Sequence, residues 1–302
     1  MIKKFLILST FFLIFINYIN AMEEDYSVAY INDYEGECEI KRKGKDITEA
    51  ISDIYVPLYE GDVVITGMGS IAEIIFDDST IVRLDPESKI LIKDLTREKN
   101  KKTIIDLLKG KIIAIVKKLI KEEEFTVKTK MAMAAVKGTE FIVETGDEEK
   151  VGVYEGQVEV SGIDLQGNVL HKVIVGKDKE TVISKKLRGP EKPRNLSKNF
   201  IKRFKEVKDL REKIEMIREL RAKGNIKEYK LKRRIQKIEN IKMMMRNNPQ
   251  RYKNLTEGQR KLVDKLIQMQ PYLEKQLDDI KRKEREQRMK VYLKEKKKEE
   301  KK

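Results

Sequence analysis

The spacing of hydrophobic and polar positions divides the chain into two parts that meet near residue 190. From Tyr26 to about residue 187, short apolar runs rich in Val and Ile recur at intervals of roughly 8–12 residues, with Gly, Asp and Ser between them. Many short runs of this kind predict an all-β sandwich, roll or solenoid. We expect strands at Val28–Ile31, Cys38–Ile40, Val63–Ile65, Ile71–Phe76, Ile81–Leu84, Ile90–Ile92, Phe125–Thr129, Phe141–Val143, Val151–Tyr154, Val158–Val160, Val169–Val175 and Thr181–Ile183.

The stretch Ile104–Ile120 is ambiguous, because an apolar run of this length also fits a buried helix. Gly110 divides it into two shorter runs. We interpret it as two further strands with a turn at the glycine.

A helical pattern replaces the strand pattern after residues 189–196, which read as a linker because they include Pro190 and Pro193. From residue 197 to residue 280 apolar positions are spaced by three and four, which predicts amphipathic helices that bury one face. The first stripe consists of Phe200, Phe204, Val207, Leu210, Ile214, Ile217 and Leu220, and a second consists of Tyr229, Leu231, Ile235, Ile238, Ile241 and Met245.

Capping residues mark the ends of these helices. Ser197 and Asn225 are N-cap residues, and Gly224 ends the first long helix. The short Gly224-Asn225 connection predicts that the first two long helices form an antiparallel, coiled-coil-like pair. Thr256 caps a later helix, and Pro271 is expected to end or kink it. Residues 281–302 form a basic charged tail, which we expect to be a frayed helix or disordered.

The first 21 residues have the layout of a secretory signal peptide. Lys3 and Lys4 precede an uncharged, mostly apolar run from Phe5 to Ile19, which is short for a membrane span. Cleavage is expected between Ala21 and Met22. The protein is therefore predicted to be periplasmic or extracellular, and membrane-anchored if the signal is not cleaved.

Charge is distributed unevenly between the two parts. The chain carries a net charge of +15, and residues 189–302 contain 38 Lys and Arg residues against 18 Asp and Glu residues, whereas residues 1–188 contain 28 and 33. The basic part has two interpretations: a segment that meets an anionic partner, or a solvated surface with many lysines.

The residues that enzymes and metal sites use are scarce. The chain has one histidine, His171, and one cysteine, Cys38, so a multi-cysteine metal site or an intramolecular disulfide is excluded. His171 alternates with apolar residues as an ordinary strand residue. Asp77, Asp78 and Asp85 lack calcium-loop spacing and read as turn residues. We therefore predict no catalytic residues, no metal, no cofactor and no enzymatic activity.

Three segments, taken in order, resemble FecR-type domains. They are Tyr59–Leu84, Phe125–Val143 and Val151–Val160, which follow the family's "GD.v.TG..S", "vrGT.F.V" and "v.V.eG.V.V" patterns. Lys130, Lys137 and Ser79 depart from the commoner family residues at turns and on the surface. The residues that carry the resemblance are Gly61, Asp62, Thr66, Gly67, Ser70, Asp78, Ser79, Gly138, Thr139, Phe141, Glu155 and Gly156, and we interpret them as structural.

The resemblance implies a β domain over residues 22–188 that works outside the cytoplasm by protein contact or ligand sensing. The family's sigma-regulating members place a cytoplasmic segment and a membrane helix before this domain, whereas here a signal sequence precedes it directly. The sigma-regulatory role is therefore not carried over.

We predict a non-enzymatic extracytoplasmic binding, sensing or scaffold protein, with the helical region serving assembly or partner contact. The expected partner is an envelope protein or a glycan. The alternative is an envelope-surface protein that binds an anionic polymer or lipid headgroups through its basic helices, and the helices could also mediate self-association. Few aromatic residues are available for base stacking in the basic part, which argues against nucleic acid.

Overall fold

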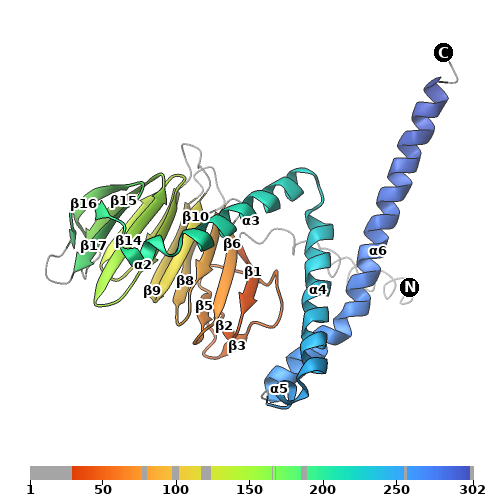
Figure 1. The fold of residues 1–302 in the computed structure, drawn as a ribbon, viewed down its shortest axis with the longest axis horizontal. Coiled ribbons are helices and arrows are strands. Elements are labelled where there is room, and N and C mark those ends of the chain that lie inside the picture. Colours follow the sequence, from red (N-terminus) through yellow and green to blue (C-terminus); the bar gives the residue numbers. More distant parts are fainter. Residues whose placement is uncertain are drawn as a thin grey trace, which may run out of the picture. The chain divides into compact units, whose positions relative to one another are not determined.

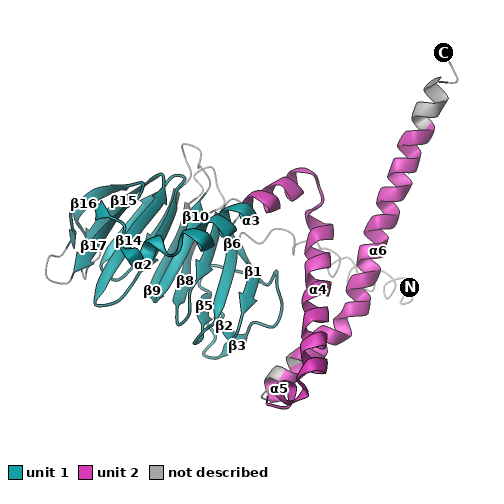
Figure 2. Ribbon diagram, viewed as in Figure 1, with its two compact units in different colours: residues 1–214 teal, residues 215–302 magenta. Residues whose placement is uncertain are grey.

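A computed structural model describes residues 29–76, 80–96, 102–116, 124–164, 166, 168–184, 189–254 and 257–299. The chain divides into two compact units, residues 1–214 and residues 215–302 (Figure 2). The first contains the β-strands and the helices that cover them, and the second is helical.

The first unit contains two large sheets (Figure 1). The first sheet has the strand order β18-β17-β14-β13-β10-β7-β6-β1-β4, and β19 also pairs with β17. Its strands are β1 (Ala29–Glu35), β4 (Pro57–Leu58), β6 (Ile71–Phe76), β7 (Thr80–Leu84), β10 (Lys111–Val116), β13 (Glu140–Glu144), β14 (Glu148–Glu155), β17 (Lys179–Ser184), β18 (Gly189–Pro190) and β19 (Arg194–Asn195).

The second sheet has the order β16-β15-β12-β11-β9-β8-β5-β2-β3. Its strands are β2 (Cys38–Lys41), β3 (Thr48–Ala50), β5 (Val63–Thr66), β8 (Lys89–Thr96), β9 (Lys102–Lys109), β11 (Glu124–Lys128), β12 (Ala132–Val136), β15 (Gln157–Ile163) and β16 (Val169–Gly176). The strand pairs are antiparallel except for β9 with β11. Gly110, at φ +91°, separates β9 from β10, which confirms the two strands predicted within Ile104–Ile120.

The chain alternates between the sheets while it advances from the β1–β4 end to the β16–β18 end (Figure 1). This order confirms the predicted β-sandwich and gives it a solenoid-like progression. The inward side chains of both sheets form one continuous core that includes Ile74, Phe76, Ile112, Phe125 and Phe141. The period-2 alternation of the sequence produces this core, because successive side chains of a strand point to opposite faces.

The predicted linker at residues 189–196 is part of the first sheet. Ile183 pairs with Pro190 across β17 and β18, and Lys179 pairs with Asn195 across β17 and β19. Two prolines did not prevent pairing, since a proline is tolerated on an edge strand. The segment then enters two helices, α2 (Lys198–Ile201) and α3 (Phe204–Ala222), and Gly224 follows α3 at φ +73°.

The second unit contains α4 (Ile226–Asn247), α5 (Pro249–Lys253) and α6 (Glu257–Glu299). α4 packs antiparallel to α6, around Ile238, Leu266 and Leu273 (Figure 1). The prediction of an antiparallel helix pair is therefore confirmed, but the partner of α4 is α6 and not α3 as predicted. α4 buries its apolar stripe against α6, and α3 uses the stripe that was expected to meet α4 to cover the first sheet.

α6 is one helix where the sequence predicted an end or a kink at Pro271 and a frayed helix or disorder beyond residue 281. It passes through Pro271 and continues to Glu299. Leu266 and Leu273 are buried on both sides of the proline, and their packing stabilises the helix across the missing backbone hydrogen bond. Among the described residues, none of the helices is both long and apolar enough to cross a membrane.

Candidate functional site

The outer face of the first sheet has an apolar centre and an acidic margin. Ile75, Ile81, Ile113, Ile115 and Ile142 point away from the sandwich core, yet all are buried. The acidic residues around them are Glu73 on β6, Asp85 after β7, Glu140 on β13 and Glu180 on β17.

Helices α2 and α3 lie across this face (Figure 1). Phe200, Val207, Leu210 and Ile214 are buried positions of the helical stripe. Phe204 is 43% exposed, although its ring packs edge-on against that of Tyr154 with the centroids 5.1 Å apart. The predicted apolar stripe therefore covers a second apolar layer, as a packing face does.

Basic residues of α3 and of the turn that connects α2 to α3 form ion pairs with the acidic margin. The Arg203 guanidinium donates two hydrogen bonds to the Asp85 carboxylate, with 2.7 Å from Nη2 to Oδ1, and this hydrogen bonding raises the pKa of Arg203. Arg211 binds both oxygens of Glu140 in the same two-pronged way. Asp85 and Glu140 are almost fully buried as residues, so each carboxylate depends on its guanidinium.

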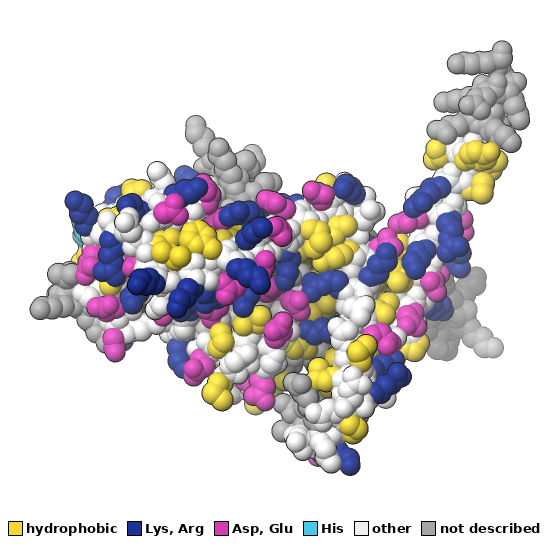
Figure 3. Space-filling model, in the orientation of Figure 1, with side chains coloured by type: hydrophobic (Ala, Val, Ile, Leu, Met, Phe, Trp, Pro, Cys, Tyr) yellow, Lys and Arg dark blue, Asp and Glu magenta, His cyan; other side chains and the backbone are white. Residues whose placement is uncertain are grey.

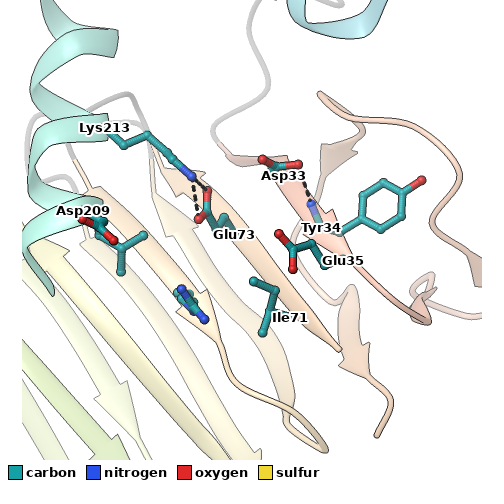
Figure 4. Close-up of a pocket in the computed structure, with 9 residues that line it drawn as sticks. Asp33, Tyr34, Glu35, Ile71, Glu73, Asp209 and Lys213 are labelled. Carbon is teal, nitrogen blue, oxygen red and sulfur yellow. Dashed lines mark hydrogen bonds and ion pairs between the residues drawn. The ribbon is translucent and has the colours of Figure 1, made fainter. Parts of the chain in front are cut away.

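Glu73 lies beside a small cavity between β1, β6 and α3 (Figure 4). Lys213 Nζ lies 2.7 Å from both Glu73 oxygens, and Asn32 Nδ2 donates to Oε2 at 3.2 Å. The cavity encloses about 180 Å³. Its lining residues are Asp33, Tyr34, Glu35, Ile71, Glu73, Arg83, Asp209, Leu210 and Lys213.

This cavity is a small gap, lined mainly by polar residues, between α3 and the sheet. Its volume is below the roughly 300 Å³ at which pockets for small-molecule ligands begin. The described residues contain no group of three or more His, Cys, Asp or Glu side chains placed to hold a metal ion. The Glu73–Lys213 pair therefore fastens α3 to the sheet.

The outer face of the second sheet is open. Its apolar side chains are partly or largely exposed, unlike those beneath α2 and α3. Leu108 and Ile174 expose 52% and 53% of their surface. Other apolar residues of this face are partly buried, among them Val63, Ile65, Leu91, Ile104, Met133 and Ala135. Charged residues, including Glu39, Lys93, Lys128 and Glu159, are interspersed among them. Several large apolar side chains exposed on one face make it a candidate interaction surface.

Asp106 stands within this open face. It lies opposite Leu91 on β8 and opposite Lys128 on β11. Its Oδ1 atom is buried and has no hydrogen-bond partner among the described residues. Desolvation raises the pKa of this carboxyl, while the nearby Lys93 and Lys128 lower it. A buried acceptor without a donor destabilises the folded protein.

Glu149 is a second buried carboxyl, at the edge of an open recess of about 520 Å³. Thr129 Oγ1 and the Met131 amide donate to its Oε2. Burial raises the pKa of Glu149, and these hydrogen bonds oppose the shift. The contacts fix the turn between β11 and β12.

The motif residues from the sequence lie at separate corners of the sandwich. Asp62 accepts hydrogen bonds from Arg42 and the Tyr59 amide, and Thr66 Oγ1 donates to the Asp85 carbonyl and accepts from the Ser88 amide. Gly61, Gly138 and Gly156 have positive φ. The Gly67 amide donates to the Glu37 carbonyl, and the Ser70 Oγ accepts a hydrogen bond from the Glu37 amide. Thr139 Oγ1 donates to the Gln157 carbonyl. Phe141 is buried in the core, and Glu155 forms an ion pair with Lys177.

These contacts hold turns, and the motif residues do not converge on one cavity. Gly156 shows why one of these turns requires glycine, because a Cβ at this position would lie 2.7 Å from the Gly138 carbonyl oxygen. Asp78, Ser79, Ala21 and Met22 lie outside the described residues. His171 is exposed on β16.

Residues 62–159 match the family model described as FecR protein. This part of the chain is a FecR-like domain. The match begins and ends within the two sheets, and the FecR-like domain therefore includes both the covered and the open face.

Two crystal structures of a "putative anti-sigma factor" from Parabacteroides distasonis ATCC 8503 are similar to part of this chain. The 1.65 Å structure is 16% identical, with a TM-score of 0.39, over 47% of this chain and 63% of the other. The 2.50 Å structure is 17% identical, with a TM-score of 0.37, over 44% and 59%. The chain thus spans less than two thirds of the solved chains. A comparison with curated proteins found no match.

Sequence reasoning missed the acidic margin of the first sheet and its basic partners, which lie on α3 and in the turn before it. Glu73 and Glu140 did carry a signal, because each places a charge within an apolar strand run. Asp85, interpreted as a turn residue, directly precedes the turn at residues 86–87 and also binds Arg203, which lies 118 positions away in the sequence.

Proposed function

We propose that this protein is a non-enzymatic regulatory or sensing protein that works outside the cytoplasm and binds a partner protein through the open face of its second sheet. The observation that carries this proposal is the contrast between the two sheets of the FecR-like domain. One outer face is sealed by α2 and α3, and the other leaves Leu108, Ile174 and their neighbours exposed.

The class of the domain supports a regulatory role, since FecR domains belong to regulatory rather than catalytic proteins. The open face is also suited to a protein more than to a small molecule. It is a sheet surface with partly exposed apolar side chains. The predicted signal sequence supports a location outside the cytoplasm.

Capture of partners from envelope extract by the immobilised full chain tests this function. The test variant carries Leu108→Asp and Ile174→Asp, which place charges on the open face. The matched control is Ile47→Asp, since Ile47 is 69% exposed but lies outside that face. We expect the same proteins with the wild type and the control, and their loss with the test variant.

Capture that is equal in all three proteins would overturn the proposed surface. Capture of nothing after chemical cross-linking in intact cells would overturn the partner-binding function as well. Circular dichroism of each variant serves as the control that the sheets remain folded.

A further inference from the structure

The far end of α6 exposes a cluster of large apolar side chains. Met289, Val291, Tyr292 and Leu293 expose 57%, 55%, 54% and 49% of their surface within five positions. Figure 3 shows hydrophobic side chains gathered at this end of the helix. Single exposed apolar residues need no explanation, but a contiguous group on a soluble helix indicates a contact surface.

This end of α6 extends past the helix that packs beside it. Lys242 of α4 donates to Gln270 of α6, which fixes the antiparallel alignment of the two helices. Counting back from Lys242 to Ile226, where α4 begins, places the start of α4 level with about residue 286 of α6. The apolar cluster lies beyond that level, so α4 does not cover it (Figure 1).

The cluster is embedded in positive charge. Residues 281–293 include six basic and two acidic residues. Arg282 pairs with Asp279 at 2.8 Å and Arg288 with Glu284 at 3.6 Å, which leaves the segment strongly cationic. Met289, Tyr292 and Leu293 share one helical face, because residues three and four apart are neighbours on a helix, and Arg285 precedes Met289 on the same face.

The spacing of apolar residues along α6 does not favour a second copy of the chain as the partner that covers this cluster. Leu266, Leu273 and Ile280 repeat every seven residues along α6, but the next two positions of that repeat are Gln287 and Lys294. The apolar seam of a coiled coil therefore ends before the exposed cluster. Two such helix ends side by side would also bring like charges together.

We propose that residues 281–293 of α6 bind the surface of membranes that contain anionic lipids. Met289, Tyr292 and Leu293 enter the headgroup region, and the flanking Arg and Lys side chains contact lipid phosphates. A basic amphipathic helix lies in the interface in this way without crossing the bilayer. Tyrosine suits the boundary because its ring is apolar and its hydroxyl is polar. This inference goes beyond the proposed function and is independent of it.

The chain contains no tryptophan, so Leu293→Trp creates a single fluorescent reporter within the cluster. The full-length variant is mixed with vesicles of phosphatidylcholine, with or without phosphatidylglycerol. We expect a blue shift of the emission only with phosphatidylglycerol, and its reversal at high salt. No shift with the anionic vesicles would overturn the proposal, and so would an equal shift with both.

Co-sedimentation with the same vesicles separates the two components of binding. We expect two double variants each to weaken association about tenfold or more. Met289→Gln/Tyr292→Ser removes apolar surface that would enter the headgroup region. Arg285→Gln/Lys290→Gln removes two basic residues, each of which contributes roughly a factor of five near an anionic surface. Ile201→Ser is the apolar control, with the same 49% exposure as Leu293, and Lys205→Gln/Lys208→Gln is the charge control. Neither control should change association.

Self-association would give a different result. A concentration-dependent blue shift of the reporter without vesicles, abolished by Met289→Gln/Tyr292→Ser, would show that a second copy covers the cluster and would overturn the lipid assignment. Tighter binding of single-stranded nucleic acid than of anionic vesicles, lost in the same variants, would also overturn it.

Discussion

Phe200 of α2 lies in the space that the missing side chain of Gly152 leaves on β14. A Cβ at Gly152 would be 2.5 Å from Phe200 Cδ2 and 2.9 Å from Leu196 Cδ2. Phe200 is 1% exposed, and its carbonyl accepts a hydrogen bond of 2.9 Å from the Tyr154 hydroxyl. The packing of α2 on the first sheet therefore depends on the absence of a side chain at Gly152.

Gly152→Ala should destabilise the first unit by about 1–3 kcal/mol, because the added methyl group overpacks the contact with Phe200. Denaturant unfolding measures the change. Gly176→Ala is the control, since Gly176 is also in a strand but a methyl group added there would have no atom within 4 Å. Adding Phe200→Leu to Gly152→Ala should recover part of the loss. Equal effects of the two alanines would contradict the proposed fit.

Arg203→Met should destabilise the same unit by about 1–3 kcal/mol, since the Asp85 carboxylate would lose two charge-assisted hydrogen bonds in a buried position. Lys208→Met, which breaks an exposed pair with Glu212, should stay within about 0.5 kcal/mol. A double-mutant cycle with Asp85→Asn isolates the coupling. A coupling no larger than that of the exposed pair would show that the Arg203–Asp85 pair does not stabilise the packing of these helices on the sheet.

Thr66→Val tests the structural role of a motif residue. The change leaves the Ser88 amide and the Asp85 carbonyl without their buried hydroxyl partner, at an expected cost of about 1–3 kcal/mol. Thr48→Val on the exposed strand β3 serves as the comparison and should be nearly neutral. Full stability of the Thr66 variant with impaired partner capture would assign the residue to binding.

Glu149→Gln should make stability less dependent on pH. Burial raises the pKa of Glu149 in the folded state, so the folded protein holds this proton more tightly than the unfolded chain does. The contribution of Glu149 is therefore most favourable below its unfolded pKa and decreases as the pH rises through the folded pKa. Glutamine keeps the acceptor for Thr129 and Met131 without the charge.

Unfolding of the wild type and the Glu149→Gln variant, measured from about pH 4 to pH 8, should show the variant gaining relative stability as the pH rises. Glu155→Gln is the control, because Glu155 is exposed and the hydrogen bond from Lys177 lowers the pKa of Glu155. A constant difference between the wild type and the Glu149 variant across this range would show that the carboxyl is not shifted upward.

The sequence by itself determined the local elements. Alternation of apolar residues fixes which side of each strand faces the core, and the glycine at residue 110 divides two strands, because both effects act within a few residues. The ordered motifs Tyr59–Leu84, Phe125–Val143 and Val151–Val160 also identified the FecR-like domain. The apolar stripe of α3 likewise indicated a buried face, but not the surface against which it is buried.

Tertiary structure decided the partners of these elements. Whether α3 meets α4 or the first sheet depends on the outward isoleucines of β6, β7, β10 and β13 and on Glu73, Asp85 and Glu140, which lie far from α3 in sequence. Apolar attraction is non-directional, so a stripe of Val, Leu and Ile fits either surface. The room beside Gly152 and the matching of three basic residues to three acidic ones select the sheet. These relationships exist only once the chain has folded.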